Sequence, residues 1–311
     1  MATDYTANEP SLTKCIIGIG QETTAGSAVT PTVFPVLLLD ESCENKPLYE
    51  PQEAITGGFA SESERMLHTA NVLDVAFSFL ARPGELLLLL QQAMGKTASG
   101  GAMDGSRDGT LKPITVEVDR VHEVLTYAGV RVDTLTISSR ANEAMRVDVT
   151  GLAMSCVRGT TPTSPTGLWS TDAVLRHGDL ALTVDTDTFA VNGIEIKIEN
   201  NMDREARANS VNRLAIPYGP RVVTCSLEMD WNATGKASFQ DNLHTPATVA
   251  VTAVWTRSAK GLTVALPLLW LTGDQPAGKG RGHWRWNVVG TAMASVIGED
   301  DEISMTLDTT A

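Results

Sequence analysis

The chain has 311 residues, of which 42% are hydrophobic and 20% are charged, and its formal net charge is −13. This length predicts two domains or one large domain, and the apolar fraction suits a sizeable core, which excludes a disordered chain. Because both halves of the sequence are acidic, the surface would repel a phosphate backbone, which argues against an ordinary nucleic-acid-binding protein.

The sequence predicts a soluble protein made in a reducing compartment. The first ten residues carry no basic segment followed by an apolar run, so we expect no signal peptide. The longest apolar run, residues 86–90, is far shorter than the ~20 residues that span a membrane. Four scattered cysteines without a C-x-x-C pair indicate reduced thiols and argue against a zinc site. They are Cys15, Cys43, Cys156 and Cys225.

Alternation of apolar and polar residues predicts that most of the chain is β-strand. Over residues 73–79 the apolar side chains face one way and the polar ones the other, which is typical of a half-buried strand. The same period recurs at residues 194–199 and 225–231. Further strands are expected at residues 33–39, 114–118, 135–137, 147–153, 249–255, 262–270 and 284–294.

Only two segments are expected to be helical. Residues 84–94 (GELLLLLQQAM) follow Pro83 and precede Gly95, the residue types at which helices typically begin and end. A weaker helical pattern covers residues 236–244. The predicted fold class is therefore α+β, and mainly β.

The order of these elements occurs twice, which indicates an internal duplication. A strand and a helix within residues 71–95 are followed by strands that end in a V-x-G-x-A-M motif at residues 149–154. The same succession begins at residue 221 and ends in V-x-G-x-A-M at residues 288–293. Each strand–helix unit follows a strand and a long polar loop, at residues 40–70 and 200–219.

A linker is predicted between the two copies. Residues 158–167 (RGTTPTSPTG) are dense in Thr, Pro, Ser and Gly. We therefore expect a first domain over residues 1–157, with an N-terminal arm and the loop 40–70, and a second domain over residues 168–311. Each is predicted to be a β-sandwich or barrel flanked by one helix.

Motifs for catalysis, cofactor binding or metal binding are weak. Gly18 and Gly20 lack the third glycine of a dinucleotide fingerprint, and the acidic run 299–302 lacks the glycine and spaced oxygens of a calcium loop. The five histidines never sit at metal-ligand spacing. Residues 281–286 (RGHWRW) interleave cations with aromatic residues, as single-strand binders do, but two tryptophans on one strand face are more often core. We expect a non-enzymatic protein with no catalytic, cofactor or metal site.

Two stretches resemble bacteriophage tail tube proteins, also called major tail proteins. Residues 14–36 resemble the start of that family, where G-x-G-x-E-T-x-x-G leads through a Pro-Thr turn into the first strand. Residues 194–231 resemble a later pattern of a leading strand, N-x-x-D, a long loop and G-x-R-x-V-x-x-S-L. The matching residues are Asn200, Asp203, Gly219, Arg221, Val223, Ser226 and Leu227. In the first copy, residues 69–79 (TANVLDVAFSF) replace this last element and lack its Gly-Pro-Arg.

The resemblance implies a subunit that self-assembles into rings, with one sheet from each domain joining its neighbours in a barrel around a lumen. Rings would stack through the arm 1–13 and the long loop. The candidate stacking residues are Thr56, Gly57, Gly58, Ser61, Glu62 and Glu64. Carboxylates in the lumen would let double-stranded DNA pass without binding it. The candidate lumen residues are Glu195, Lys197, Glu199, Glu228 and Asp230, and an outer solvent face is the alternative for them.

The implied partners are other copies of the chain, the tail terminator, the tape measure and baseplate or tip proteins, without a membrane. The implied location is the virion tail, assembled in the host bacterial cytoplasm. If six tube domains surround the lumen, three two-domain chains complete a ring; a hexamer in which one domain lines the lumen is the rival. The alternative functions are a tail hub or neck subunit, or a free-standing β-sandwich binding or decoration module.

Overall fold

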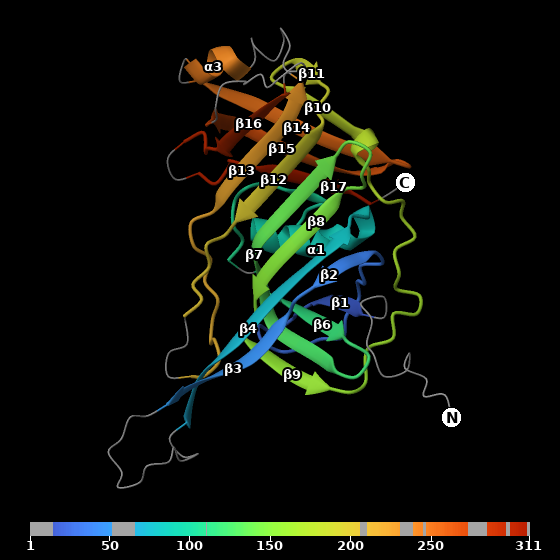
Figure 1. Cartoon of the computed structure of the whole chain (residues 1–311), viewed down its shortest axis with the longest axis vertical. Helices are drawn as coiled ribbons and strands as arrows, with labels where there is room; N and C mark the ends of the chain where they lie inside the picture. Colours follow the sequence, from blue (N-terminus) through green and yellow to red (C-terminus); the bar gives the residue numbers. More distant parts are fainter. Residues whose placement is uncertain are drawn as a thin grey trace.

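The computed structural model describes residues 15–51, 66–109, 111–205, 210–230, 239–244, 247–272, 285–296 and 299–309. Within this part of the chain, backbone pairing links seventeen strands into one network (Figure 1). The α+β, mainly β class expected from the sequence is confirmed.

Among the described residues the first half contributes nine strands and the main helix. The strands are β1 (Ile16–Gln21), β2 (Leu38–Glu41), β3 (Glu44–Pro51), β4 (Met66–Leu80), β5 (Ala102–Met103), β6 (Ile114–Asp119), β7 (Val124–Arg140), β8 (Arg146–Leu152) and β9 (Ser155–Gly159), and the helix is α1 (Pro83–Met94). The described part of the second half contributes eight strands, a short helix and a 3-10 turn. They are η4 (His177–Asp179), β10 (Leu180–Val184), β11 (Asp187–Phe189), β12 (Gly193–Glu199), β13 (Val222–Asp230), α3 (Asp241–His244), β14 (Thr248–Arg257), β15 (Lys260–Leu271), β16 (Arg285–Ala292) and β17 (Ser304–Asp308).

Several segments differ from the sequence-based expectation. Strands β1, β5, β9, β10, β11 and β17 were not expected, and β7 extends beyond the expected residues 135–137 on both sides. The loop expected at residues 40–70 contains strand β3, whose polar sequence ENKPLYEP shows no alternation and which forms because its backbone pairs with β4. The strand expected at residues 33–39 gives only isolated bridges at Val33 and Phe34, and β2 begins at Leu38, because Pro35 cannot donate to a ladder. Of the helix expected at residues 236–244 the structure describes residues 239–244, and α3 covers the last four of them.

Strand β7 belongs to two sheets. Its N-terminal part pairs with β6 and β9, and β1 extends that sheet by pairing with β6. Its C-terminal part pairs with β8, which pairs with β4, and β4 carries β2 and β3 at the edge. Gly129, with φ 70°, lies where β7 passes from β9 to β8, a left-handed conformation that favours glycine.

The second half repeats this order of pairing. Strands β10, β14, β15 and β17 form one succession, and β15 continues through β16 and β13 to β12. The register also repeats, because Val75 lies opposite Gly151 in the β4–β8 pair and Cys225 lies opposite Gly290 in the β13–β16 pair. These two glycines belong to the two V-x-G-x-A-M motifs.

The halves meet where β7 pairs with β12, with Leu135 opposite Ile198 and Ser139 opposite Ile194. One long sheet therefore runs in the order β3, β4, β8, β7, β12, β13, β16 and β15 (Figure 1).

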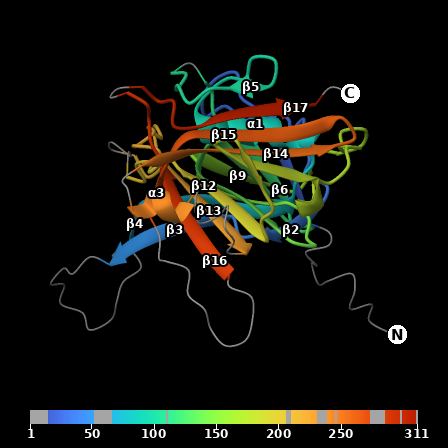
Figure 2. The ribbon, with the colours of Figure 1, turned by 90° about the horizontal axis from the view of Figure 1, so that it is seen from above.

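Helix α1 covers one face of this long sheet (Figures 1 and 2). It begins at Pro83, whose fixed φ suits the first helical turn, and ends at Gly95 in the left-handed region, with φ 66°. Leu86, Leu89 and Leu90 are fully buried against the sheet, and burying each such side chain contributes about 2 kcal/mol. In the described part of the chain no helix covers the opposite face of the sheet (Figure 2).

Candidate functional site

The five candidate lumen residues share the face of the sheet that lies opposite α1. On β12 the isoleucines at positions 194, 196 and 198 are buried, while Glu195 is exposed and Lys197 and Glu199 are half-buried. On β13 Glu228 is half-buried and Asp230 is exposed, alternating with the buried Leu227 and Met229. The register places Glu195 opposite Ser226 and Gly193 opposite Glu228, so both strands present their acids on one side.

Polar residues continue across this face onto the first half. Lys197 lies opposite Thr136 of β7, and Thr136 lies opposite Asp148 of β8, so these three side chains share one row across the strands. In the next row Ser138 lies between Glu195 and Arg146. We call this side of the sheet the polar face and define it by its charged residues, together with Ser226 and Asn287. Its charged residues are Arg140, Arg146, Asp148, Glu195, Lys197, Glu199, Glu228 and Asp230.

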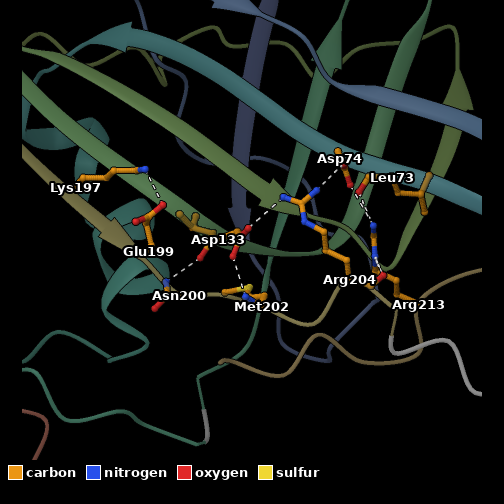
Figure 3. A network of polar contacts seen from close by, with 10 residues as sticks. Leu73, Asp74, Asp133, Lys197, Glu199, Asn200, Met202, Arg204 and Arg213 are labelled. Carbon is orange, nitrogen blue, oxygen red and sulfur yellow. Dashed lines mark hydrogen bonds and ion pairs between the residues drawn. The ribbon is translucent and has the colours of Figure 1, made fainter. Parts of the chain in front are cut away.

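The cations of the polar face are partly neutralised by neighbouring acids. The Nζ of Lys197 lies 2.6 Å from Oε1 of Glu199 (Figure 3). The Nη2 of Arg146 lies 2.6 Å from Oδ1 of Asp148. Such exposed pairs contribute at most about 1 kcal/mol each, so their main effect is on the local field. Acids outnumber bases on the polar face, which gives it a net negative charge.

The polar face is hollowed between β7, β12, β13 and β16. A wide, open depression of about 510 Å³ is lined by Arg140, Glu195, Ser226, Glu228 and Asn287, among others. A second depression of about 250 Å³ adjoins it and shares Arg140 and Glu195. Because both are open and lined mainly by polar groups, they fit a hydrated surface rather than an apolar ligand pocket.

A loop of the second half lies across the first half, beside this face (Figure 3). Arg204 contacts Asp74 of β4 and Asp133 of β7, with both nitrogen–oxygen distances at 3.3 Å. Arg213, 4% exposed, donates to the carbonyl of Leu73 at 2.9 Å and to Asp74 at 3.2 Å. This loop therefore fixes the second half to β4 and β7 of the first.

The residues of the N-x-x-D and G-x-R patterns hold this loop and helix α1 in place. Asn200 is fully buried and donates from Nδ2 to the carbonyls of Ala93 and Val132. Arg221 donates to the carbonyl of Met94, the last residue of α1, and pairs with Glu302. Helix α1 has no basic residue of its own in its last turn, so Arg221 supplies the cation that the C-terminus of a helix favours.

Some of the positions singled out from the sequence lie outside the described residues, and one lies in the core. The stacking residues at 56–64 and the arm 1–13 lie outside the described residues, as does Trp284. Trp286 lies in the core, 4% exposed, with its ring 6.2 Å from that of Phe239. Asp148, Arg146 and Arg140 were not singled out from the sequence, although the alternation expected at residues 147–153 would have placed Asp148 on a polar face.

The described residues offer neither a metal-binding group nor a thiol with a lowered pKa. They contain no group of three or more His, Cys, Asp and Glu side chains that could hold a metal ion. Burial raises the pKa of Cys15 and of Cys156 to about 11 and that of Cys225 to about 12, which keeps these thiols protonated and poorly nucleophilic. None of the helices in the described part has the length and apolar character to traverse a bilayer.

Comparison with known proteins agrees with the resemblance stated above. The family model described as phage tail tube protein matches residues 13–311, nearly the whole chain. No curated protein matches the chain. The mainly β structure agrees with this match. Because the match spans nearly the whole chain, the chain belongs to the phage tail tube protein family and is a structural subunit of a virion tail, not an enzyme.

Proposed function

We propose that the chain forms closed rings that stack into the tail tube, and that the polar face of the long sheet lines the lumen. The observation that carries the proposal is the two-sided sheet, with α1 on one face (Figure 2) and charged side chains on the other. Among the described residues, β3 pairs with β4 alone, so one end of the sheet has an open edge. Closure of several such sheets into a barrel removes open edges.

Net negative charge on the polar face favours passage of DNA. A duplex carries about one negative charge per 1.7 Å of axis, so a basic lumen would retain it by releasing counterions. The acids of the polar face outnumber its cations and would repel the duplex as it moves. They include Glu195, Glu199, Glu228 and Asp230. An outer face exposed to solvent remains the alternative role for these residues.

We also propose that residues 1–157 and 168–311 are two copies of a tube domain, joined by the linker 158–167. The repeated pairing order and the matching positions of Gly151 and Gly290 support the duplication. The β7–β12 pair then represents the contact between neighbouring domains. Six domains around the lumen correspond to three chains, which gives a trimeric ring with pseudo-sixfold symmetry.

In the virion this tube would connect with the tail terminator, the tape measure protein and the baseplate or tip proteins, after assembly in the host bacterial cytoplasm. Stacking would use the residues at 56–64 and the arm 1–13. A tail hub or neck subunit would form a single ring, and a decoration module would stay monomeric or form small oligomers.

Electron microscopy of the purified chain and of virion tails tests these proposals. We expect long tubes, and a map with three identical chains in each ring. Six identical chains in each ring would refute the trimer, whereas isolated single rings would favour the hub or neck. A chain that stays monomeric at high concentration and is absent from tail tubes would overturn the proposed function as a whole.

A further inference from the structure

A small apolar cluster fastens the second half to the first, apart from the main core. Leu152, at the end of β8, is fully buried against Met202 and Ile216, which come from the segment between β12 and β13. Met154 and Tyr218 pack against the same cluster. The guanidinium of Arg131 lies 4.8 Å from the centre of the Tyr218 ring. The segment after β12 thus covers the end of β8 in the preceding half.

The repeated register identifies the equivalent place on the second half. Gly151 corresponds to Gly290, so Leu152 and Met154 correspond to Thr291 and Met293. Arg131 lies opposite Leu152 and Trp270 lies opposite Thr291, so Arg131 corresponds to Trp270.

In the second half this place is exposed. The exposed fractions are 38% for Trp270, 47% for Met293 and 57% for the nearby Val296. We call these three residues the uncovered patch. Large apolar side chains gathered on a surface commonly mark an interaction site.

The register also identifies the covering residues of the first half. Ile198 lies opposite Val223 and Asn45 lies opposite Leu73, the residue equivalent to Val223. Continuing the residue count beyond the end of β12 and before the start of β13, where the chain is no longer strand, aligns Met202 with Tyr49, and Ile216 and Tyr218 with Met66 and His68.

These covering residues lie on the β3–β4 hairpin, which projects away from the body of the molecule (Figure 1). Tyr49 is 55% exposed, and Met66 and the adjacent Leu67 are each 50% exposed. The rings of Tyr49 and His68 lie 5.4 Å apart. The hairpin therefore presents an apolar tip that the rest of the described chain does not cover.

The hairpin cannot reach the uncovered patch of its own chain. Strands β3 and β15 stand at opposite ends of the long sheet, with six strands between them. At about 4.8 Å per strand spacing the two ends are roughly 30 Å apart along the sheet. A contact between hairpin and patch must therefore join two molecules.

We propose that the β3–β4 hairpin of one chain packs on the uncovered patch of a second copy, with Tyr49 and Met66 against Trp270 and Met293. The molecule that covers the patch is another copy of this chain, because the equivalent contact already exists between its two halves. That contact is made by Met202 and Ile216 on Leu152 and Met154. The contact is head-to-tail, so repetition closes a ring or builds a helix. The inference rests on the proposed ring assembly and names its lateral contact.

Cross-linking tests the contact directly. In the full-length chain carrying Tyr49→Cys and Met293→Cys, a short thiol-specific bifunctional reagent applied to assembled tubes should give covalent dimers and trimers on a denaturing gel. Chains with either substitution alone report on the native cysteines and should stay largely monomeric. The pair Met154→Cys and Met202→Cys is the matched control, because its link forms within one chain and adds no mass.

A charge substitution tests the energetics. Met293→Glu places a carboxylate in the apolar contact and should raise the concentration needed for ring assembly at least tenfold, measured by light scattering. Val157→Glu is the control, since Val157 is 64% exposed on β9, away from the patch, and should assemble like the unsubstituted chain. Equal melting temperatures of the monomers would show that both variants fold.

The outcomes separate this inference from the proposed function. Tubes that form normally while the double-cysteine chain gives no more cross-links than the single variants would overturn the hairpin contact and leave the tube assignment intact. Normal assembly of Met293→Glu would overturn it as well. A chain that never assembles would overturn both.

Discussion

The Nη1 of Arg213 donates a 2.9 Å hydrogen bond to the carbonyl of Leu73, joining the second half of the chain to strand β4 of the first. The same nitrogen reaches the carbonyl of Ala153 at 3.3 Å, and Nε donates to the carbonyl of Arg204 at 2.9 Å. One buried cation thus satisfies three main-chain carbonyls and holds the loop after β12 on the first half (Figure 3).

Arg213→Ala is therefore expected to destabilise the folded chain by about 2–4 kcal/mol, because it leaves buried carbonyls and the carboxylate of Asp74 with fewer donors. Chemical denaturation measures the change. Arg204→Ala is the matched control: its side chain is 54% exposed and its ion pairs are worth less than about 1 kcal/mol. Equal losses for the two variants would contradict the role given to Arg213.

Gly151→Ala is expected to cost about 2–4 kcal/mol, more than Gly290→Ala at the equivalent position. A Cβ on Gly151 would lie 2.7 Å from the main-chain oxygen of Arg131, which the β7–β8 ladder holds in place. A Cβ on Gly290 would lie 2.6 Å from Cγ of Leu269, a side-chain atom, which can shift further than a main-chain oxygen fixed in a ladder. Thermal unfolding of both variants measures the difference, and the reverse order would contradict this account.

Glu85→Gln is expected to stabilise the chain by about 2 kcal/mol at pH 8 and to have little effect at pH 4. Burial raises the pKa of Glu85 to about 7, because the carboxyl near the start of α1 is 1% exposed and accepts one hydrogen bond, from Val36. Protonation therefore favours the folded state: this contribution is fully present below about pH 4.5 and is lost as the pH rises through 7. Melting temperatures across this pH range check the sign, and stabilisation of the same size at pH 4 would refute it.

Replacing Glu195 and Glu199 together by Lys is expected to slow DNA ejection from virions. The polar face would become cationic, so duplex DNA would bind it with an affinity that falls steeply as salt is added. Ejection rates at two salt concentrations measure the effect. A double Lys replacement of Asp119 and Glu123, which lie at the β6–β7 turn, makes the same change in net charge and should leave ejection unchanged. Equal slowing by both pairs would argue against a lumen role.

Deleting residues 56–64 is expected to give a folded subunit that forms rings but does not stack them. The segment belongs to the polar stretch that the sequence predicts to be a long loop, and long loops in compact domains commonly serve a function. Circular dichroism would report the fold and electron microscopy the assembly. Tubes of normal length from the deletion variant would contradict a stacking role.

Much of the sheet and of its polar face could be predicted from alternation. Successive side chains of a strand point to opposite sides, so the isoleucines of β12 had to share the core face and Glu195, Lys197 and Glu199 the other. Helix α1 could be predicted equally well, because Pro83 and Gly95 set its two ends through their own backbone conformations. The depression around Arg140 could not be predicted from the sequence, because it depends on how four strands are placed side by side. These strands are β7, β12, β13 and β16.

The sequence by itself therefore determined the strands with clear alternation, such as β12 and β13, together with the side of each that is buried, and where α1 begins and ends. Only the tertiary structure decided the partners: that polar β3 joins β4, that β7 serves two sheets, and that β7 meets β12 between the halves. The reason is that strands pair through backbone groups, which are nearly the same in every residue. A strand's partner is consequently set by how the buried faces close around one core, and by contacts such as Arg213 to Leu73 that join distant parts of the chain.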